Sequence, residues 1–171
     1  VSATYEASDA VNLYARVAKG YRAPSIQGRA LFVFTTVQDA ISTADSETIM
    51  SYEAGIKTQF SNRLRFNLSA FHYDYSGLQL TQVGPFCVGG TNCTVTTNAT
   101  SAKVDGIELE GTLTPSANDR LDFSAAYLNA RYGRFLPNTV AFPALNWEGL
   151  KLDRSPSLTL SAGYTHTFDL A

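Results

Sequence analysis

Two glutamates separated by one residue, Glu108 and Glu110, are the pair in this sequence best suited to acid–base chemistry. Paired carboxylic acids catalyse glycoside hydrolysis when they flank the scissile bond. On an extended strand, however, side chains two positions apart point the same way and lie about 7 Å apart. No nucleophile or base partner accompanies them in the sequence. We therefore expect no catalytic residues and no enzymatic activity.

The two cysteines, Cys87 and Cys93, lie in the segment PFCVGGTNCTV, which has two glycines between them. This spacing favours a small disulfide loop over the alternative of two free thiols, and a disulfide implies an oxidising compartment. A metal site would need more ligands, and neither His72 nor His166 lies close in sequence. We expect a disulfide, no metal site and no cofactor.

The elements that would position these residues follow a two-residue period, which is clearest in residues 52–80. One face of the first half carries apolar side chains such as Ala54 and Ile56, and the other carries Glu53 and Lys57. A short turn at 61–63 separates this half from a second alternating run. Such a pattern predicts a β-hairpin.

Similar alternation predicts about seven strands in all. Besides the hairpin at 50–77, we predict strands at 1–7, 12–20, 103–113, 121–132 and 157–168, with a short strand possible in the segment ALFVF at 30–34.

The connections between these strands alternate between two kinds. Turns of about three to five residues are expected at 8–10, 61–63 and 115–119, and long connections at 21–49, 78–101 and 133–155. Long structureless loops argue against a compact soluble domain. They are typical of membrane β-barrels, which have short periplasmic turns and long extracellular loops.

Charged side chains occupy only one face of most predicted strands. An Arg or Lys facing lipid at mid-depth would cost about 2–4 kcal/mol, whereas a wet lumen tolerates charge. The tyrosines at the strand ends suit a girdle at the lipid headgroups better than a ligand site; they are Tyr73, Tyr75, Tyr127 and Tyr164. The candidates for the lumen face are Arg16, Glu53, Lys57, Glu108 and Glu110.

Composition excludes several other classes of protein. The net charge is -2 without a basic run, so we expect no nucleic-acid partner. The chain has no stretch of about 18 apolar residues, which excludes a transmembrane helix. The N-terminal residues VSATYEASDA lack the basic and apolar regions of a signal peptide, so we expect the interior of a longer chain.

Four motifs in order resemble the C-terminal β-barrel of TonB-dependent outer-membrane receptors. The chain reads GYRAP, then SETIMSYEAGIK, then NLSAFHYDY, then GIELE, and the resemblance covers nearly its whole length. The matching positions are Gly20, Tyr21, Arg22, Pro24, Glu47, Tyr52, Glu53, Gly55, Lys57, Asn67, Phe71, Asp74, Tyr75, Gly106, Ile107, Glu108 and Glu110.

The resemblance implies an all-β fold: an antiparallel meander that forms a segment of a transmembrane barrel of about 22 strands, with a plug in its lumen. It implies a bacterial outer-membrane protein that imports a scarce large solute, such as a siderophore–iron chelate, cobalamin or an oligosaccharide. The implied partners are the bilayer, the solute and the TonB complex of the inner membrane, which acts through the plug. We expect residues 1–171 to be a partial barrel domain without the plug. On its own, such a sheet would have open edges and no transport activity.

Two other functions fit parts of the pattern. A surface or secreted all-β binding module, such as a sandwich adhesin, would have short connections at both ends of its strands. A passive porin-like channel would share the strand pattern, and only the motif resemblance argues against it.

Overall fold

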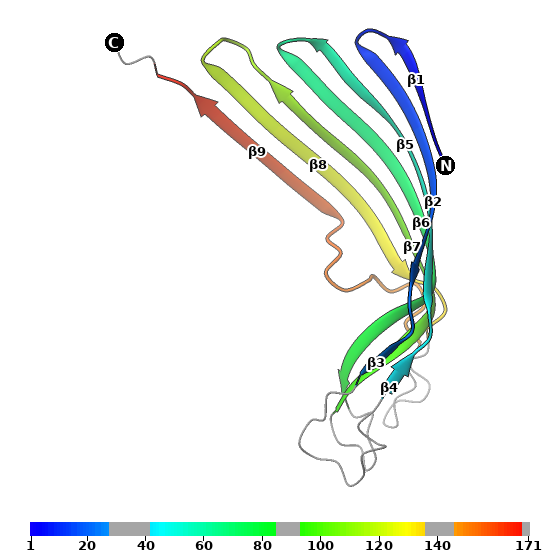
Figure 1. The fold of residues 1–171 in the computed structure, drawn as a ribbon. Coiled ribbons are helices and arrows are strands. Elements are labelled where there is room, and N and C mark those ends of the chain that lie inside the picture. The colour runs from blue at the N-terminus through cyan, green and yellow to red at the C-terminus, as the bar shows by residue number, and fades with distance from the viewer. Residues whose placement is uncertain (28–41, 85–92, 136–145, 169–171) are drawn as a thin grey trace.

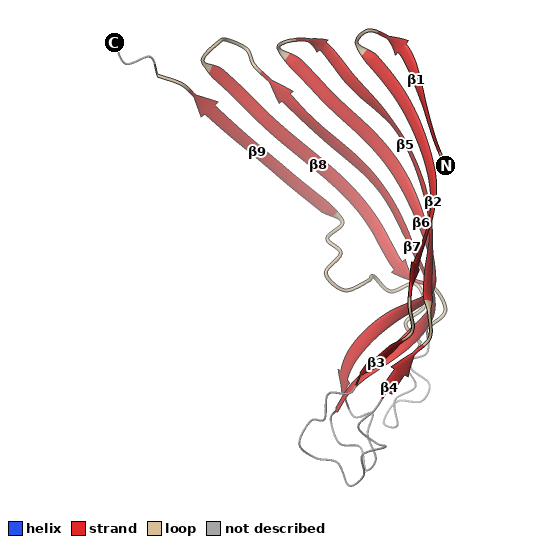
Figure 2. Ribbon diagram, in the orientation of Figure 1, coloured by secondary structure: helices blue, strands red, loops and turns tan. Residues whose placement is uncertain are grey.

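The computed structural model describes residues 1–27, 42–84, 93–135 and 146–168. In this part of the chain all regular structure is β-strand (Figure 2). The strands are β1 (Ser2–Ser8), β2 (Val11–Arg22), β3 (Ser25–Gln27), β4 (Ser42–Ala44), β5 (Glu47–Ser61), β6 (Leu64–Gly84), β7 (Cys93–Leu113), β8 (Asp119–Tyr132) and β9 (Leu158–His166). Among the described residues, no helix is long and apolar enough to cross a bilayer.

Seven strands form one antiparallel sheet in the order β1-β2-β5-β6-β7-β8-β9, and β3 pairs with β4 separately. Figure 1 shows the sheet as a curved single layer, with the three short turns together at one end. The β3–β4 pair and the ends of β6 and β7 lie at the other end, called the loop end below. The predicted all-β meander, its main strands and its short turns are thus confirmed.

The predicted connection at 78–101 is wrong for most of its length. β6 continues to Gly84 and β7 already begins at Cys93, with Leu78 paired to Ala99 and Val83 to Thr94. The residues here are rich in Thr and Val, which favour strands, and the ladder between two long neighbours extends through them. Their Thr, Asn and Gly content led us to expect a loop.

The other long connections differ less from expectation. Within 21–49, β5 begins earlier than predicted, at Glu47, and the short strands β3 and β4 were not predicted. The segment ALFVF lies outside the described residues. In the connection after β8, Arg131 forms an isolated bridge with Lys151, while β9 begins at Leu158.

Gln79 on β6 organises the loop end of the sheet and is only 7% exposed. Its side-chain amide donates to the carbonyls of Ala23 and Asp45, and its side-chain oxygen accepts from Ser25. Its backbone N–H donates to the Glu47 carboxylate. Every polar group of the buried amide side chain is therefore paired, and these bonds tie β6 to the segments around β3 and β4.

A small hydrophobic cluster lies where β8 ends. Ala99, Tyr132 and Phe135 are buried, and Trp147 packs on both rings, edge-on to Phe135 at 5.4 Å between centroids. The backbone N–H of Trp147 donates to the Phe135 carbonyl at 2.9 Å. These contacts hold the described part of the β8–β9 connection, from residue 146, against the sheet.

Two glycines shape the central strands for different reasons. Gly77 has φ 67°, a left-handed conformation that other residues rarely adopt, and it lies in β6 just before the loop-end extension. Gly106 in β7 lies beneath the Phe71 ring, where an added Cβ would come within 2.3 Å of the ring carbon Cζ. A ring covering a cross-strand glycine restores the packing that glycine itself lacks.

Candidate functional site: the charged face of the sheet

The strand register brings the five predicted charged residues onto one face. Arg16 lies opposite Glu53, and Lys57 lies opposite Asn67, which in turn lies opposite Glu110. Glu108 lies opposite Ser69 on the same face. Cross-strand partners point to the same side of a sheet. The five candidates, Arg16, Glu53, Lys57, Glu108 and Glu110, therefore share one surface, called the charged face below.

Tyr14 links two of these charges and was not among the predicted site residues. Its hydroxyl donates to Glu53 Oε1 at 2.7 Å, and Lys57 Nζ lies 5.2 Å from the centre of its ring. The ring thus provides a hydrogen bond to the carboxylate and a cation–π contact to the ammonium group. It also covers Gly55, where an added Cβ would meet a ring carbon at 2.5 Å. The alternation that placed Arg16 on this face also places Tyr14 there.

A shallow hollow of about 490 Å³ lies over the middle of the charged face. Its walls include Tyr14, Glu53, Lys57, Glu108 and Glu110. Asn67 donates to Glu110 Oε1 at 2.7 Å, so one of the three carboxylates is held by a neutral amide. The hollow therefore presents three carboxylates and one ammonium group, which suits a partner with cationic or hydroxyl groups.

A second hollow, of about 390 Å³, continues toward the turns and includes Arg65, Arg120 and Asp122. Arg120 binds Asp122 through two nitrogen–oxygen contacts, of 2.7 and 2.8 Å, and Thr112 donates to the same carboxylate. This part of the charged face carries arginines, whereas the middle is acidic.

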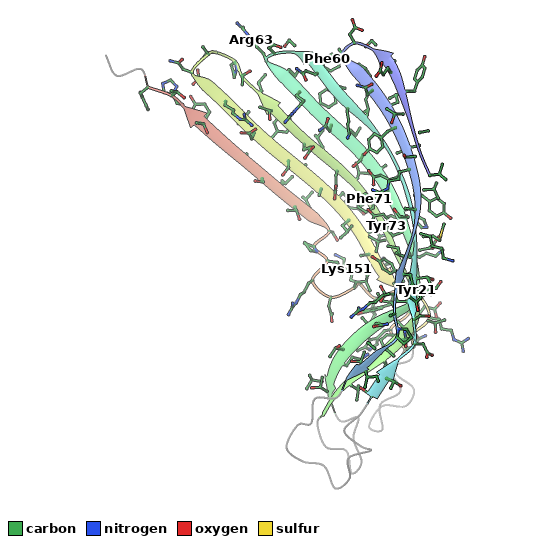
Figure 3. All side chains as sticks on the ribbon, viewed as in Figure 1. Tyr21, Phe60, Arg63, Phe71, Tyr73 and Lys151 are labelled. Carbon is green, nitrogen blue, oxygen red and sulfur yellow. The ribbon has the colours of Figure 1, made fainter. Side chains whose placement is uncertain are left out.

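Aromatic rings occupy the charged face toward the loop end. Phe71 and Tyr73 stack with centroids 4.8 Å apart (Figure 3), and Tyr75 follows on the same side of β6. The girdle prediction is therefore wrong for Tyr73 and Tyr75, because they lie on the face of Glu53. Tyr127 and Tyr164 lie on the opposite face, with Ile107 and Leu121. The prediction grouped the four tyrosines together, although side chains at odd and even positions of one strand point to opposite sides of the sheet.

The opposite face is mainly apolar and exposed, and is called the apolar face below. The prediction that charge occupies only one face of most strands is wrong near the loop end, where Lys19, Asp74, Lys103 and Arg131 lie on this face. Ile107 is 51% and Leu160 67% exposed, and the same face carries other large side chains over β1 to β9. These are Tyr5, Leu13, Val17, Tyr21, Tyr52, Phe60, Leu68, Tyr127, Leu158 and Tyr164. Soluble monomers rarely expose contiguous apolar surface of more than a few hundred Å².

A hydrogen-bonded cluster closes the turn between β7 and β8. The Asp119 carboxylate accepts from Ser116 and Tyr164, both at 2.5 Å, and lies 2.7 Å from His166 Nδ1. These bonds favour the ionised form, so the hydrogen bond from Ser116, followed by those from Tyr164 and His166, holds the pKa of Asp119 well below its usual range. The cluster ties the turn to β9.

The structure does not test the predicted disulfide between Cys87 and Cys93. Cys93 begins β7, and Cys87 lies outside the described residues, so the disulfide stays a prediction. Within residues 1–27, 42–84, 93–135 and 146–168, no group of three or more His, Cys, Asp or Glu side chains is arranged to hold a metal ion.

Comparison with known proteins identifies the family. Residues 1–171 match the family model for the TonB dependent receptor-like β-barrel. No curated protein sequence matches significantly.

Several solved structures share the fold. The ferric yersiniabactin uptake receptor FyuA from Yersinia pestis superposes with a TM-score of 0.68 at 16% identity, over 99% of this chain and 22% of that one. The siderophore receptor PiuA from Acinetobacter baumannii gives a TM-score of 0.63 at 16% identity, over 96% and 23%. The copper transporter OprC gives 0.58 at 18% identity, over 77% and 20%.

The chain thus spans 20 to 23% of the length of these three proteins. They are receptors and transporters rather than enzymes. Its sheet corresponds to part of a barrel wall, which is why it is open at β1 and β9. The chain belongs to the TonB-dependent receptor-like β-barrel family and forms part of the wall of a bacterial outer-membrane barrel.

Proposed function

We propose that this sheet is part of the wall of an active outer-membrane importer for a scarce large solute. The observation that carries the proposal is the opposed chemistry of the two faces between the turns and the loop end, where the central strands carry charge on one side and exposed aliphatic side chains on the other. A sheet of this kind separates lipid from a wet lumen. The solved relatives include a ferric yersiniabactin receptor and siderophore receptors, which favours a ferric siderophore over cobalamin or an oligosaccharide.

The charged face would line the lumen and meet a plug domain encoded outside residues 1–171. Glu53, Glu108 and Glu110 present carboxylates over the central hollow, and Glu108 is exposed. Arginine or lysine side chains on the plug would complement them, because a carboxylate in a narrow lumen pairs well with a cation. Arg16 and Lys57 would contribute to the same interface by pairing with carboxylates on the plug. The wall residues thus hold the plug until it is displaced.

Import would then follow from binding at the loop end and movement of the plug. The solute would bind to the extracellular loops and the plug apices, and the TonB complex would pull on the plug from the periplasmic side. A path would open along the polar wall, whose hydroxyl and charged groups replace part of the hydration shell of the solute. No bond is made or broken, so no catalytic residue is assigned.

The test uses the intact receptor in cells, with a radiolabelled ferric siderophore as the probe. Uptake should require both the receptor and TonB, and should stop when the proton gradient is collapsed. Equal uptake without TonB would instead indicate a passive channel. Surface adhesion without uptake of any tested chelate would indicate a binding module.

The contribution of the wall is tested by Glu108→Gln combined with Glu110→Gln. We expect uptake to change several-fold while siderophore binding at the cell surface stays the same, because the carboxylates would contact the plug and not the initial binding site. Asp9→Asn, in the turn between β1 and β2, is the control; it makes the same change from carboxylate to amide at a position outside the strands. Equal uptake by the double variant and the control would remove the plug contact from the proposal.

A further inference from the structure

A row of mostly charged side chains crosses the apolar face near the loop end. The register pairs Lys19 with Met50, Met50 with Asp74, Asp74 with Lys103, and Lys103 with Arg131, and the bridge continues the row to Lys151. The row, called the basic row below, therefore holds four cations, one carboxylate and the uncharged Met50; the charged residues are Lys19, Asp74, Lys103, Arg131 and Lys151. It lies on the face of Leu13, Leu68 and Ile107 and not on the charged face.

The position of the basic row matches the upper edge of a membrane band. Leu64 begins β6 at the turn end, and Asp74 follows it by ten residues. That separation is about 33 Å along a strand, or about 25 Å of depth at a tilt of about 40°. The apolar band of an outer-membrane barrel is about 25 Å tall. The basic row therefore lies at the level of the outer-leaflet headgroups.

The cations of the row are incompletely neutralised by the protein. Lys103 Nζ lies 3.7 Å from Asp74, and its side chain is 67% exposed. Lys19 is exposed and forms no ion pair with the described residues. Arg131 donates to Asn129 and to the Gly149 carbonyl, both neutral acceptors. Lys151 donates to the Ser157 hydroxyl, which is also neutral.

The nearby carboxylates are already engaged by a histidine. His72 Nδ1 lies 2.6 Å from Asp105, and its Nε2 lies 3.0 Å from Asp74. Asp74 and Asp105 are therefore both hydrogen-bonded to the His72 ring, and Asp74 also lies near Lys103. The net charge of the basic row therefore remains positive, and its guanidinium and ammonium groups are available as donors on the apolar face.

The turn end of the same face has a different chemistry. Its edge carries Phe60, Leu64, Leu121 and Tyr164, and Phe60 contacts Phe66 with ring centroids 5.7 Å apart. The two headgroup levels are therefore unlike: aromatic and aliphatic side chains predominate at the turn end, beside Arg63 and the Asp119–His166 pair, whereas a row of cations lies at the loop end.

We propose that the basic row binds the phosphate groups of a phosphorylated outer-leaflet lipid, whose acyl chains lie against the apolar face below. Lys103 and Arg131 contact phosphate oxygens from the neighbouring strands β7 and β8, about 5 Å apart, a spacing that lets one phosphate meet two cations, and Lys19 on β2 extends the row toward a further phosphate. Leu68, Ile107 and Tyr127 contact the chains beneath. The inference requires the barrel to lie in the outer membrane and is independent of what it imports.

The test uses the intact receptor purified in detergent, with diphosphorylated lipid A as the probe and its dephosphorylated form for comparison. Each cation near an anionic headgroup contributes about a fivefold gain in affinity, so Lys103→Gln with Arg131→Gln should weaken binding about 25-fold. Binding should also weaken in high salt. Native mass spectrometry of the lipid-bound receptor gives the affinities.

Three controls make the test specific. Arg63→Gln, at the turn between β5 and β6 (Figure 3), removes a positive charge from the other membrane level and should leave binding unchanged. Arg131→Lys, which keeps the charge, should restore most of the binding. Heat-modifiable electrophoresis of each variant confirms that the barrel is folded.

Other outcomes would overturn the inference. Equal binding of both lipid forms would show that the phosphates are not recognised. Equally tight binding of inorganic phosphate would identify a soluble anion site instead of a lipid site. Loss of lipid binding on chelation of divalent cations, without an effect of the lysine and arginine variants, would assign the contact to a metal bridge at the carboxylates.

Discussion

The two faces of β5 and β6 share one backbone but face different surroundings. On the charged face, Glu53 and Lys57 interact with Tyr14, and Asn67 binds Glu110. On the apolar face, Leu68 is 40% exposed, and none of the described residues forms a second layer above it (Figure 1). A folded soluble sheet covers its apolar side with protein. In the proposed importer the bilayer is the covering layer of the apolar face, and a wet lumen takes the place of bulk water at the charged face.

The comparison is tested most strongly by placing one charge on each face. Ala125 and Ala126 are adjacent and identical, but Ala125 pairs with Leu109 on the apolar face and Ala126 with Glu108 on the charged face. Ala125→Arg should destabilise the intact barrel by about 2–4 kcal/mol at mid-depth. Ala126→Arg should cost less than about 1 kcal/mol, because water and Glu108 are near. Denaturant unfolding in lipid vesicles measures both, and equal costs would contradict the assignment of the faces.

The next effect concerns the glycine beneath Phe71. Gly106→Ala should destabilise the barrel by about 1–3 kcal/mol, because the new Cβ would displace a ring that stacks on Tyr73. Gly163→Ala, where nothing lies within 4 Å, is the control within the described residues and should change stability little. Unfolding free energies of both variants and of Phe71→Leu with Gly106→Ala test the contact. A cost at Gly106 that persists in the double variant would show that the ring is not responsible.

A smaller effect is expected at Tyr14. Tyr14→Phe removes the hydroxyl that donates to Glu53 but keeps the ring over Gly55 and beside Lys57. Hydrogen bonds to charged groups contribute about 1.5–3 kcal/mol when buried, and this partly exposed bond should contribute about 1 kcal/mol. Tyr14→Ala should cost more, since it also uncovers the glycine. Similar unfolding free energies for the two variants would place the contribution in the hydroxyl alone.

The smallest effect is expected at the β7–β8 turn, which lies beyond the membrane band. The pKa of Asp119 is lowered in the folded state, so its hydrogen bonds stabilise the fold above the unfolded pKa of about 3.9. This contribution is lost as pH falls below that value toward the folded pKa. Asp119→Asn should therefore reduce the difference in unfolding free energy between pH 6 and pH 3. An unchanged pH dependence in the variant would show that other carboxylates cause it.

Much of the architecture was predictable because the strand signal is local. Alternation in residues 52–60 and 103–113 identified which side chains share a face, and short polar segments marked the three turns. The charged face was predicted for the same reason. The extension of β6 to Gly84 was missed, because Thr- and Asn-rich segments resemble loops until a neighbouring strand pairs with them.

The sequence by itself determined the seven main strands, the turns and, between the turns and the loop end, the division of the central strands into a charged and an apolar side, since a two-residue period requires no partner. Only the tertiary structure decided which residues of different strands contact one another. The register places Lys19, Lys103 and Arg131 in one row, brings Phe71 over Gly106, and buries Gln79 among backbone carbonyls. These contacts join residues tens of positions apart, and a shift of one residue in register would move every side chain of a strand to the other face.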